Sequence, residues 1–390
     1  MRVPPAPPLP TLPLRIRVNG RHPRFFRKMV GRPDQKTEPG GLVRVVDRDD
    51  TFVGIGFVNP RTLLCLRLLT HDEEAVDAGF FVRRLQAAVD LREGELQLRE
   101  TGNAYRLVHG EGDGLPGLIL DRLGEFLVAQ VHALGILAFL EPLGVWLKQR
   151  YPGARLVLTV DERARELEGI TGYAPPGPLE GELSEWGITY RVRPGGGHKT
   201  GFFCDQRDNR RFFADRCGGH RVLDLCTNSG GFALTAARHG GAREVVGYDL
   251  DEAAVALARE NARRNQLAVR FEQGDLFTVL RDLPAGSYDR IVLDPPKWAA
   301  APEQLDAAGA RYRDANRLAL ARIAPGGLLF TFSCSGSLSE DRFLGLLRDA
   351  AALAGRDAQV LAVRGAGPDH PVALECPETR YLKAILLRVR

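Results

Sequence analysis

The feature that most constrains the fold is a regular alternation of strand-type and helix-type segments that begins at about Lys199. Helix-type segments such as GFALTAARHG (231–240) and EAAVALARENARRNQ (252–266) separate the strand-type ones. Alternating strands and helices form a parallel sheet covered on both faces, with ligands at the carboxyl ends of its strands. We therefore predict an α/β domain with a doubly wound sheet. The expected strands are RVLDLCT (221–227), EVVGYDLD (244–251), VRFEQGD (269–275), DRIVLDPP (289–296) and GLLFTFSCS (327–335).

A β-rich region opens the chain. Residues from about Leu14 to Thr70 contain short segments of alternating apolar and polar side chains, which favour a small twisted β-barrel. An amphipathic helix is expected next, from about Glu73 to Glu93. The expected strands of the barrel are LRIRV (14–18), GLVRVVDRDDTFVGIGFVN (41–59) and TLLCLRLL (62–69).

A second region lies between the barrel and the α/β domain. Residues from about 104 to 193 follow the order strand, strand, helix, strand, strand, which indicates a small α+β module. PGGGH (194–198) is expected to be a flexible joint. The predicted domains are a proline-rich tail (1–13), a β-barrel (14–88), a central α+β module (89–193) and the α/β domain (194–390).

The composition is that of an ordinary globular protein. Hydrophobic residues make up 44% and charged residues 26%, the net charge is +4, and no run approaches the ~18 apolar residues of a membrane helix. The first fourteen residues hold six prolines, which suits an extended tail better than a secretory signal. We expect a cytoplasmic protein that does not cross a membrane. Its six cysteines show no C-x-x-C pair, so neither a disulfide framework nor a metal site is expected.

Three aspartates follow successive predicted strands of the α/β domain. Asp224 opens the turn DLCTNSGGF (224–232), whose glycines let the backbone approach a ligand. The dinucleotide pattern G-x-G-x-x-G is absent there, so the turn suits a cofactor with an amino-acid moiety. Asp249 is placed to accept two ribose hydroxyls, and Asp275 to accept an adenine amino group. Each aspartate alone is an ordinary cap or turn former, but the three in this order favour a cofactor site.

The next two predicted strands end in residues suited to catalysis. Asp294 is followed by Pro295 and Pro296, which cannot continue a strand and fix a rigid elbow that aims Asp294 over the cofactor. Cys334 lies at the end of the following strand, between two serines. A buried cysteine is usually inert, but one at a strand's open end facing this elbow is the best nucleophile candidate of the six.

Several motifs of the chain together resemble those of one known family, the SAM-dependent large-subunit rRNA cytosine-5 methyltransferases with an N-terminal PUA domain. The resemblance extends over nearly the whole chain after about residue 14, and the motifs are specific in combination. They are YRLVHGEGDGLPGLILDR (105–122), GFFCDQRDNR (201–210), LDLCTNSGGF (223–232), DPPKW (294–298), SCS (333–335) and PETRYLK (377–383).

The resemblance implies a particular fold, cofactor and partner. The fold is an RNA-binding PUA barrel, a central α+β module and a Rossmann-like class I methyltransferase domain. SAM is the implied cofactor and large-subunit ribosomal RNA the implied partner, and self-association into a homodimer is compatible with the family. The implied cofactor-binding residues are Asp205, Gln206, Arg207, Asp224, Asn228, Gly230, Asp249, Asp275 and Asp294.

The resemblance also implies roles at the reacting base. The implied catalytic residues are Cys334 and Asp294, and the implied substrate contacts are Pro295, Pro296, Lys297 and Trp298. Two departures from the family pattern are expected to change local packing. Asn228 and Ser229 stand where the family usually has an aromatic residue, and Trp298 stands where Phe is commoner.

The chemistry of such a reaction follows from the weakness of cytosine carbon 5 as a nucleophile. A thiolate that adds to carbon 6 activates carbon 5 toward the sulfonium methyl, and loss of the carbon 5 proton then releases the cysteine. We expect Cys334 to add and Asp294 to hold the base. An ordinary thiol has a pKa of ~8.5, so a cation such as Lys297 is expected to lower it. Trp298 or Phe202 offers a face for the flipped base, with core packing as an equal alternative.

Two basic segments allow RNA contacts. NGRHPRFFRK (19–28) interleaves five basic residues with two phenylalanines, which fits either RNA binding or a solvated loop. In RDNRRFFADR (207–216), helical spacing directs the phenylalanines inward and the arginines outward, as surface groups beside the site.

Other functions stay open on the sequence alone. One is SAM-dependent methylation of a base nitrogen, such as that of guanine, which needs no covalent step and would survive loss of Cys334. A non-catalytic RNA-binding or assembly protein is disfavoured because it would not need Asp249, Asp275, Asp294 and Cys334 together. A nicotinamide oxidoreductase is disfavoured by the missing G-x-G-x-x-G.

Overall fold

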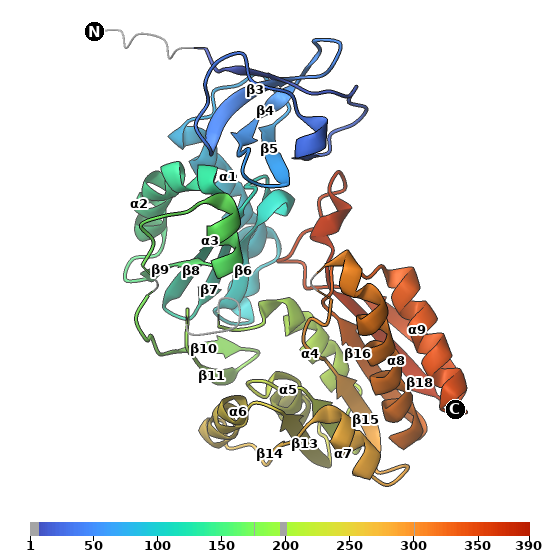
Figure 1. Ribbon diagram of the computed structural model, residues 1–390. Coiled ribbons are helices and arrows are strands. Elements are labelled where there is room, and N and C mark those ends of the chain that lie inside the picture. Colours follow the sequence, from blue (N-terminus) through green and yellow to red (C-terminus); the bar gives the residue numbers. More distant parts are fainter. Residues whose placement is uncertain (1–7, 175, 196–200, 300) are drawn as a thin grey trace.

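The structure is a computed structural model that describes residues 8–174, 176–195, 201–299 and 301–390. Within these ranges the strands form four sheets. The five-stranded sheet lies at one end of the molecule, the four-stranded sheet lies next to it, and the seven-stranded sheet lies at the opposite end (Figure 1). Residues 1–7 of the predicted tail and 196–198 of the predicted joint lie outside the described residues.

The first sheet begins earlier than the sequence predicts. Leu12 and Leu14 are both buried, and residues 11–13 pair in parallel with β3, so part of the predicted tail belongs to this sheet. The predicted strand at 14–18 is wrong, because Leu14 forms an isolated bridge with Val30 and the chain then bends away. The strands, in the sheet order β1-β3-β4-β5-β2, are β1 (Thr11–Pro13), β3 (Gly41–Val46), β4 (Phe52–Val58), β5 (Leu64–Thr70) and β2 (Arg24–Phe26).

The central layer packs directly against this first sheet. Helix α1 (Ala78–Asp90) starts where the Asp77 side chain accepts a hydrogen bond from the Phe80 N–H, and a π-helical turn follows it. Phe57 of β4 stacks on Phe81 of α1, with ring centroids 6.0 Å apart. The other elements are β6 (Ala104–His109), β7 (Leu118–Leu123), β8 (Phe126–Val131), α2 (Leu140–Arg150), β9 (Arg155–Val160) and α3 (Glu162–Glu168), with the sheet order β6-β7-β8-β9.

A hairpin of β10 (Gly181–Glu185) and β11 (Ile188–Val192) forms its own two-stranded sheet. We predicted these strands as the end of the central module, and they contact both neighbours. The Ser184 N–H donates to Asn103 Oδ1, just before β6, at 2.7 Å, and other contacts reach the following domain. The backbone N–H of Thr189 donates to Asn265 Oδ1 and that of Arg191 to Asn261 Oδ1, each at 2.9 Å. The side-chain oxygens of Asn261 and Asn265 therefore accept the backbone N–H groups along this edge of the hairpin, which fixes its position against them.

The largest sheet has the order β14-β13-β12-β15-β16-β18-β17. Its five predicted strands pair in parallel. Two strands that we did not predict add an antiparallel edge, because β18 pairs antiparallel with both β16 and β17. The strands are β12 (Arg221–Leu225), β13 (Glu244–Asp249), β14 (Arg270–Gln273), β15 (Tyr288–Leu293), β16 (Ile323–Ser333), β17 (Ala358–Arg364) and β18 (Lys383–Val389). The helices are α4 (Arg207–Ala214), α5 (Gly231–His239), α6 (Glu252–Arg264), α7 (Leu276–Asp282), α8 (Leu305–Arg322) and α9 (Glu340–Leu353).

Helices cover both faces of this sheet (Figure 1). Val222 and Val292 belong to the core under α4, α5, α6 and the hairpin, whereas Leu223 and Ile291 belong to the core under α7, α8 and α9. This alternation is the pattern of a buried strand with two covered faces. The carboxyl ends of the parallel strands meet at one edge, where the predicted site residues lie. In the described part of the chain, no helix is long and apolar enough to span a bilayer.

Candidate active site

Asp224 is a buried carboxylate near the end of strand β12, just before the glycine-rich turn. Its Oδ2 accepts hydrogen bonds from Thr227 Oγ1 (2.6 Å) and from the backbone N–H of Ala233 (3.0 Å). Its Oδ1 is buried without a hydrogen-bond partner among the described residues. Burial raises the pKa of Asp224 to about 7. A buried acceptor without a partner is costly, so this oxygen suits a donor or a cation supplied by a ligand.

The turn after β12 has a left-handed backbone conformation at three positions. Cys226, Asn228 and Gly230 all have positive φ, at 62°, 49° and 87°. A Cβ added at Gly230 would lie 2.8 Å from Cζ of Phe271, so this position requires glycine for space as well as for its backbone conformation. Asn261 of α6 donates to the Ser229 carbonyl at 3.0 Å and so fixes the turn from behind.

Asp249 and Asp275 lie at the ends of the two neighbouring strands. Asp249 Oδ2 accepts a hydrogen bond from the Asn228 N–H at 2.8 Å, which joins the ends of β12 and β13. Asp275 caps helix α7, because its Oδ2 accepts from the backbone N–H groups of Phe277 (3.1 Å) and Thr278 (3.0 Å). For Asp275 the cap that we considered as an alternative is therefore present. This cap places the Asp275 carboxylate at the same sheet edge as the carboxylates of Asp224 and Asp249.

Gln206 connects the segment before α4 to the proline elbow. Its Nε2 donates to Asp294 Oδ2 at 2.9 Å, and its Oε1 accepts from Asn209 at 2.8 Å. Its neighbour Asp205 accepts a hydrogen bond from the Tyr381 hydroxyl at 2.5 Å. Both Asp205 and Gln206 are buried. The predicted residues Asp205, Gln206 and Asp294 therefore come together, with Tyr381 as a partner that we did not predict.

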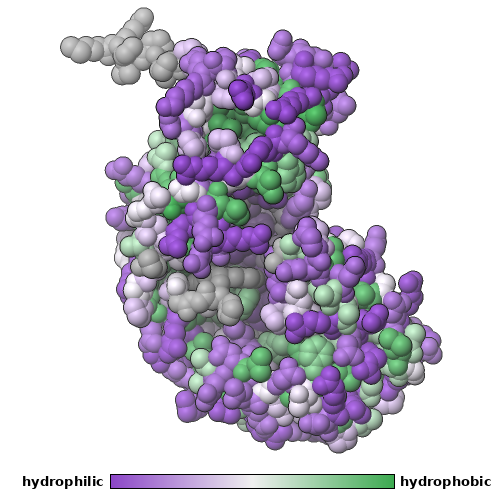
Figure 2. Space-filling view, in the orientation of Figure 1, coloured by the Kyte–Doolittle hydropathy of each residue, from purple (hydrophilic) through white to green (hydrophobic). Residues whose placement is uncertain are grey.

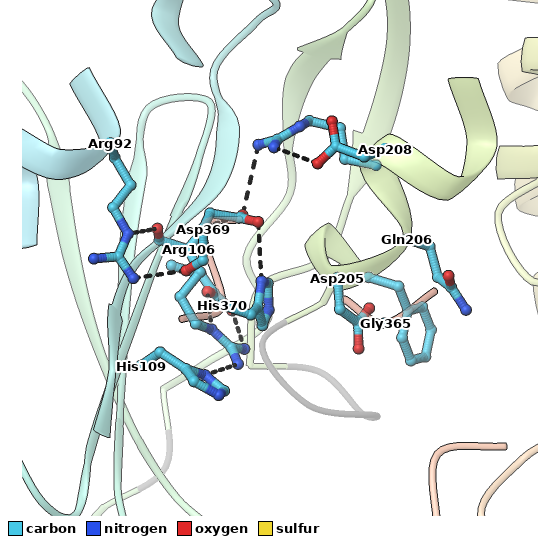
Figure 3. A network of polar contacts seen from close by, with 12 residues as sticks. Arg92, Arg106, His109, Asp205, Gln206, Asp208, Gly365, Asp369 and His370 are labelled. Atoms are coloured by element: carbon cyan, nitrogen blue, oxygen red, sulfur yellow. Dashed lines mark hydrogen bonds and ion pairs between the residues drawn. The ribbon is translucent and has the colours of Figure 1, made fainter. Parts of the chain in front are cut away.

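Arg207 belongs to a different buried network. Its guanidinium contacts Asp208 at 2.8 Å and Asp369 at 3.6 Å, and Asp369 accepts the Arg106 N–H of β6 at 2.9 Å. Figure 3 shows this network between the central sheet and the segment before β18, with Asp205 to one side. Its Nη2 donates to Asp208, whereas its Nε and Nη1 have no hydrogen-bond partner among the described residues, so Arg207 stays a predicted cofactor contact.

The expectation that the arginines of α4 point outward is wrong for Arg207 and Arg210, which are both buried. Arg210 pairs with Glu185 of the hairpin through Nε (2.7 Å) and Nη2 (2.8 Å) and lies over the Phe202 ring. Phe202 is itself buried against Tyr190, with ring centroids 5.1 Å apart, so it packs in the core and offers no face to a base. Helical spacing alone cannot show that a distant hairpin supplies a buried carboxylate.

Cys334 and the proline elbow lie at the ends of adjacent parallel strands. Leu293 of β15 pairs with Thr331 of β16, so the residues that follow them emerge at the same edge. Cys334 and Asp294 are both half-buried. Ser335 is fully buried and fixes this arrangement, because its Oγ accepts a hydrogen bond from the backbone N–H of Ala299.

The predicted substrate contacts differ in their surroundings. Pro295 is buried, whereas Pro296 and Lys297 are exposed. Trp298 is half-buried, with its ring centroid 4.6 Å from that of Tyr312 and 6.1 Å from that of Phe277. Trp298 therefore packs against the core on one side, in agreement with the alternative that we left open for it.

Lys383 is a site residue that we did not single out. It is buried, and its Nζ donates to the carbonyl oxygens of Ser335 (2.6 Å) and Tyr381 (2.8 Å). Burial lowers the pKa of Lys383 to about 8, while attraction to Cys334 opposes this shift. The motif PETRYLK contained the residue, but nothing in its spacing indicated that β18 runs beside β16.

Outside this edge, His22, Cys376 and Glu378 bring ligand atoms within 4.8 Å of one another. His22 Nε2 lies 3.3 Å from a Glu378 carboxylate oxygen, and the Cys376 thiol donates to the same carboxylate at 3.4 Å. We expected no metal site from the cysteine spacing, and His22 is far in sequence from Cys376 and Glu378, which are two residues apart. Their mutual contacts join the first sheet to the segment before β18.

Comparisons with known proteins agree with the fold. Residues 150–367 match the S-adenosylmethionine-dependent methyltransferase family, and residues 16–71 match the PUA-like domain. Ribosomal RNA large subunit methyltransferase I of Aeromonas hydrophila is 38% identical over 383 residues, which cover 95% of this chain and 96% of that protein. The Tolumonas auensis protein of the same name is 39% identical, with 94% and 95% covered. The solved structure of SMU.776 complexed with SAH has a TM-score of 0.77 at 21% identity, covering 90% of this chain and 92% of that one.

The fold and these matches define an S-adenosylmethionine-dependent methyltransferase with an N-terminal PUA-like domain. Its cofactor is therefore SAM, and Asp224 Oδ1, which has no hydrogen-bond partner among the described residues, fits a ligand with a cationic amino-acid group. More narrowly, the chain belongs to the family of ribosomal RNA large subunit methyltransferase I. The predicted Rossmann-like α/β fold with a PUA-like domain is confirmed.

Proposed function

We propose that this protein transfers a methyl group to carbon 5 of a cytosine in large-subunit ribosomal RNA, with Cys334 as the nucleophile. The position of Cys334 carries the proposal. It is a half-buried thiol at the end of β16, at the same sheet edge as Asp294. A nucleophile and a carboxylate at one strand-end edge, beside a SAM-binding turn, suit covalent activation of a pyrimidine.

Each step assigns a role to a residue of this edge. When bound, SAM would supply an electrophilic methyl group, with the neutral thioether that keeps the electrons of the broken carbon–sulfur bond as the leaving group. The Cys334 thiolate forms a bond to carbon 6, and the ring electrons that this displaces make carbon 5 nucleophilic toward that methyl. Asp294 holds the ring nitrogen and the exocyclic amino group of the base. Loss of the carbon 5 proton to a base restores the ring double bond and expels the Cys334 thiolate, so the cysteine is regenerated.

The cofactor contacts follow from the carboxylates along the sheet edge. Asp224 Oδ1 accepts from the amino group of SAM, because it is buried and has no other partner among the described residues. Asp249 binds the ribose hydroxyls and Asp275 the adenine amino group, each at the end of its own strand. Gly230 and Asn228 line the turn between them.

Asp205 and Gln206 complete the cofactor side of the site. Gln206 orients Asp294 through the hydrogen bond between their side chains. Asp205 lies next to it in the chain, and its backbone carbonyl accepts from the Gly367 N–H at 3.1 Å. The remaining contacts, with the target base, come from the elbow residues Pro295 to Trp298.

The RNA partner is inferred from the relatives named ribosomal RNA large subunit methyltransferase I and from the PUA-like domain. The basic segment 19–28 supports it, because Phe26 is exposed next to the exposed cations Arg27 and Lys28. A recess lies between the central module and the methyltransferase domain (Figure 2), and RNA that occupied it would lie beside the methyltransferase sheet. We infer a cytoplasmic location from this substrate, and a homodimer stays a prediction.

Nucleoside analysis tests the proposal. The purified protein is incubated with tritiated SAM and large-subunit rRNA from a strain that lacks the gene, and the RNA is digested to nucleosides. Label in 5-methylcytidine is the expected result. Label in a methylguanosine would keep the fold and the cofactor but contradict the covalent mechanism.

A further inference from the structure

Lys383 is held at a fixed place beside the predicted nucleophile. It begins strand β18 and pairs with Ser333 of β16, the residue directly before Cys334. Its ammonium donates to the carbonyl of Ser335, the residue directly after Cys334, at 2.6 Å, and to the carbonyl of Tyr381 at 2.8 Å. Because Lys383 contacts both sides of Cys334 and is buried, its charge stays close to the thiol.

Among the charged groups around Lys383, Cys334 is the best candidate for an ion pair with its ammonium. The groups that interact with its charge are Cys334, Lys297, Arg380 and Glu340. Arg380 and Glu340 form an ion pair with each other at 2.5 Å, so their charges largely offset one another. Lys297 is an exposed cation and repels Lys383. A buried ammonium with two carbonyl acceptors gains most from an anion at the Cys334 sulfur.

We propose that Lys383 is a positioning residue that stabilises the thiolate of Cys334. The thiol gives its proton to solvent, the lysine keeps its own, and the resulting S⁻ and ammonium form a pair at the end of β16. This inference rests on the proposed function for its meaning in catalysis. It replaces Lys297, which the sequence offered as the activating cation, with a lysine that the strand pairing places beside the thiol.

A purely structural role makes a different prediction. The two hydrogen bonds of Lys383 to backbone carbonyls would by themselves hold the loop after β16 in place. Lys383→Gln keeps an N–H donor and removes the charge, and Lys383→Arg keeps the charge. If Lys383 acts through its charge, Gln raises the pKa of the Cys334 thiol and Arg does not. If it acts only as a structural donor, neither change moves that pKa.

The pH profile of thiol alkylation measures this directly on the full chain, without SAM or RNA. Iodoacetamide is added between pH 6 and 10, and modification of Cys334 is followed by mass spectrometry on the tryptic peptide 323–342, which contains no other cysteine. The wild-type thiol is expected to titrate below the ordinary ~8.5. In Lys383→Gln the alkylation rate at pH 7 falls about tenfold for each unit by which the thiol pKa rises. Lys383→Arg retains the wild-type profile.

Three controls keep the test decisive. Thermal melting and SAM binding show whether each variant is folded. The peptide 222–238, which carries Cys226, reports alkylation elsewhere in the domain. In Lys297→Gln, the profile of Cys334 is expected to stay close to that of the wild type.

A wild-type thiol that titrates at or above ~8.5 would overturn the proposal even if the Gln variant does not fold. An unchanged profile in folded Lys383→Gln, or an equal shift in Lys297→Gln, would also overturn it. Because alkylation needs no methyl transfer, failure here is distinguishable from failure of the proposed function, which the nucleoside analysis reports.

Discussion

The backbone N–H of Ala299 donates a hydrogen bond to Ser335 Oγ at 3.1 Å, and this contact ties the loop after β15 to the loop after β16. The Tyr312 hydroxyl lies 3.1 Å from the same oxygen. The elbow that carries Asp294 and the turn that carries Cys334 are therefore held together by one buried serine, which sets the relative position of the two proposed catalytic residues.

Replacement of that serine tests the coupling between the loops. Ser335→Ala leaves the Ala299 N–H without its partner, which costs about 1–3 kcal/mol of folding stability. We expect kcat to fall by about 10²-fold because the two catalytic groups lose their alignment, while the Kd for SAM stays unchanged. Ser337→Ala, at an exposed position two residues on, is the matched control. Unchanged kcat in Ser335→Ala would contradict this account.

Loss of the nucleophile should abolish methylation without affecting the cofactor site. We expect Cys334→Ala to lower kcat by about 10³-fold or more, because no other described cysteine lies at this strand end. SAM binding, measured by calorimetry, should match that of the wild type. Cys65→Ala, in the core of the first sheet, controls for the loss of a thiol. Full activity in Cys334→Ala would show that methyl transfer is not covalent.

Gly230 tests whether the cofactor turn needs a glycine at this position. Gly230→Ala combines a strained backbone, at φ 87°, with a Cβ only 2.8 Å from Phe271. Gly286→Ala is a matched control with φ 74° and no atom within 4 Å of the added Cβ. We expect Gly286→Ala to cost about 1–2 kcal/mol in urea unfolding and Gly230→Ala to cost more. Only Gly230→Ala should weaken SAM binding, and equal effects in both variants would contradict the role of this turn.

The raised pKa of Asp224 predicts a pH dependence of stability without SAM. Burial holds the folded pKa at about 7, above the ~3.9 of the unfolded chain. Between these two pH values the folded state therefore binds more protons than the unfolded state. The stabilising contribution of Asp224 is complete below about pH 4 and is lost as the pH rises through about 7. Urea unfolding at pH 5 and pH 7 should show this loss in the wild type but not in Asp224→Asn.

The same carboxylate makes SAM binding release a proton. Below pH 7 much of Asp224 is protonated, and the cationic amino group of SAM favours the ionised form. Calorimetry at pH 6 in two buffers of different ionisation enthalpy should report proton release in the wild type and none in Asp224→Asn. Asp282→Asn, at an exposed helix end, should behave as the wild type does. Equal proton release in Asp224→Asn would remove Asp224 from the SAM site.

Asp369 tests the buried network that joins the central module to the methyltransferase sheet. Although burial alone would raise the pKa of Asp369, its interactions with His370 and Arg207 and the hydrogen bond from the Arg106 N–H hold that pKa below its usual range. Its stabilising contribution is therefore present above pH ~3.9 and is lost as pH falls. Asp369→Asn leaves buried cations uncompensated and should cost about 3–5 kcal/mol in urea unfolding. Asp208→Asn, at a half-exposed position, should cost much less.

The sequence predicted what depends on local order along the chain. Asp224, Asp249 and Asp275 follow successive strands, and strand-helix alternation puts successive strand ends at one edge. Cys334 and Asp294 could be predicted as neighbours for the same reason. The motif that holds Gln206 came from the family resemblance, and the structure adds its contact with Asp294.

What could not be predicted depends on contacts between distant segments. Lys383 reaches Cys334 because β18 returns antiparallel beside β16, and no local pattern shows that pairing. We expected Arg210 at the surface, because the period of a helix shows which residues share a face but not what packs against that face. The hairpin carboxylate of Glu185, 25 residues earlier in the chain, turns that arginine inward.

The covalent role of Cys334 can be measured most directly with RNA in which cytidine is replaced by 5-fluorocytidine. Fluorine at carbon 5 cannot leave as a proton does, so a cysteine that has added to carbon 6 stays attached after methyl transfer. With unsubstituted RNA shown to be methylated in parallel, we predict an RNA adduct that survives denaturation and maps to peptide 323–342, and none with Cys334→Ala. Methylation of the unsubstituted RNA without any such adduct on the fluorinated RNA, or an adduct on another cysteine, would contradict the account.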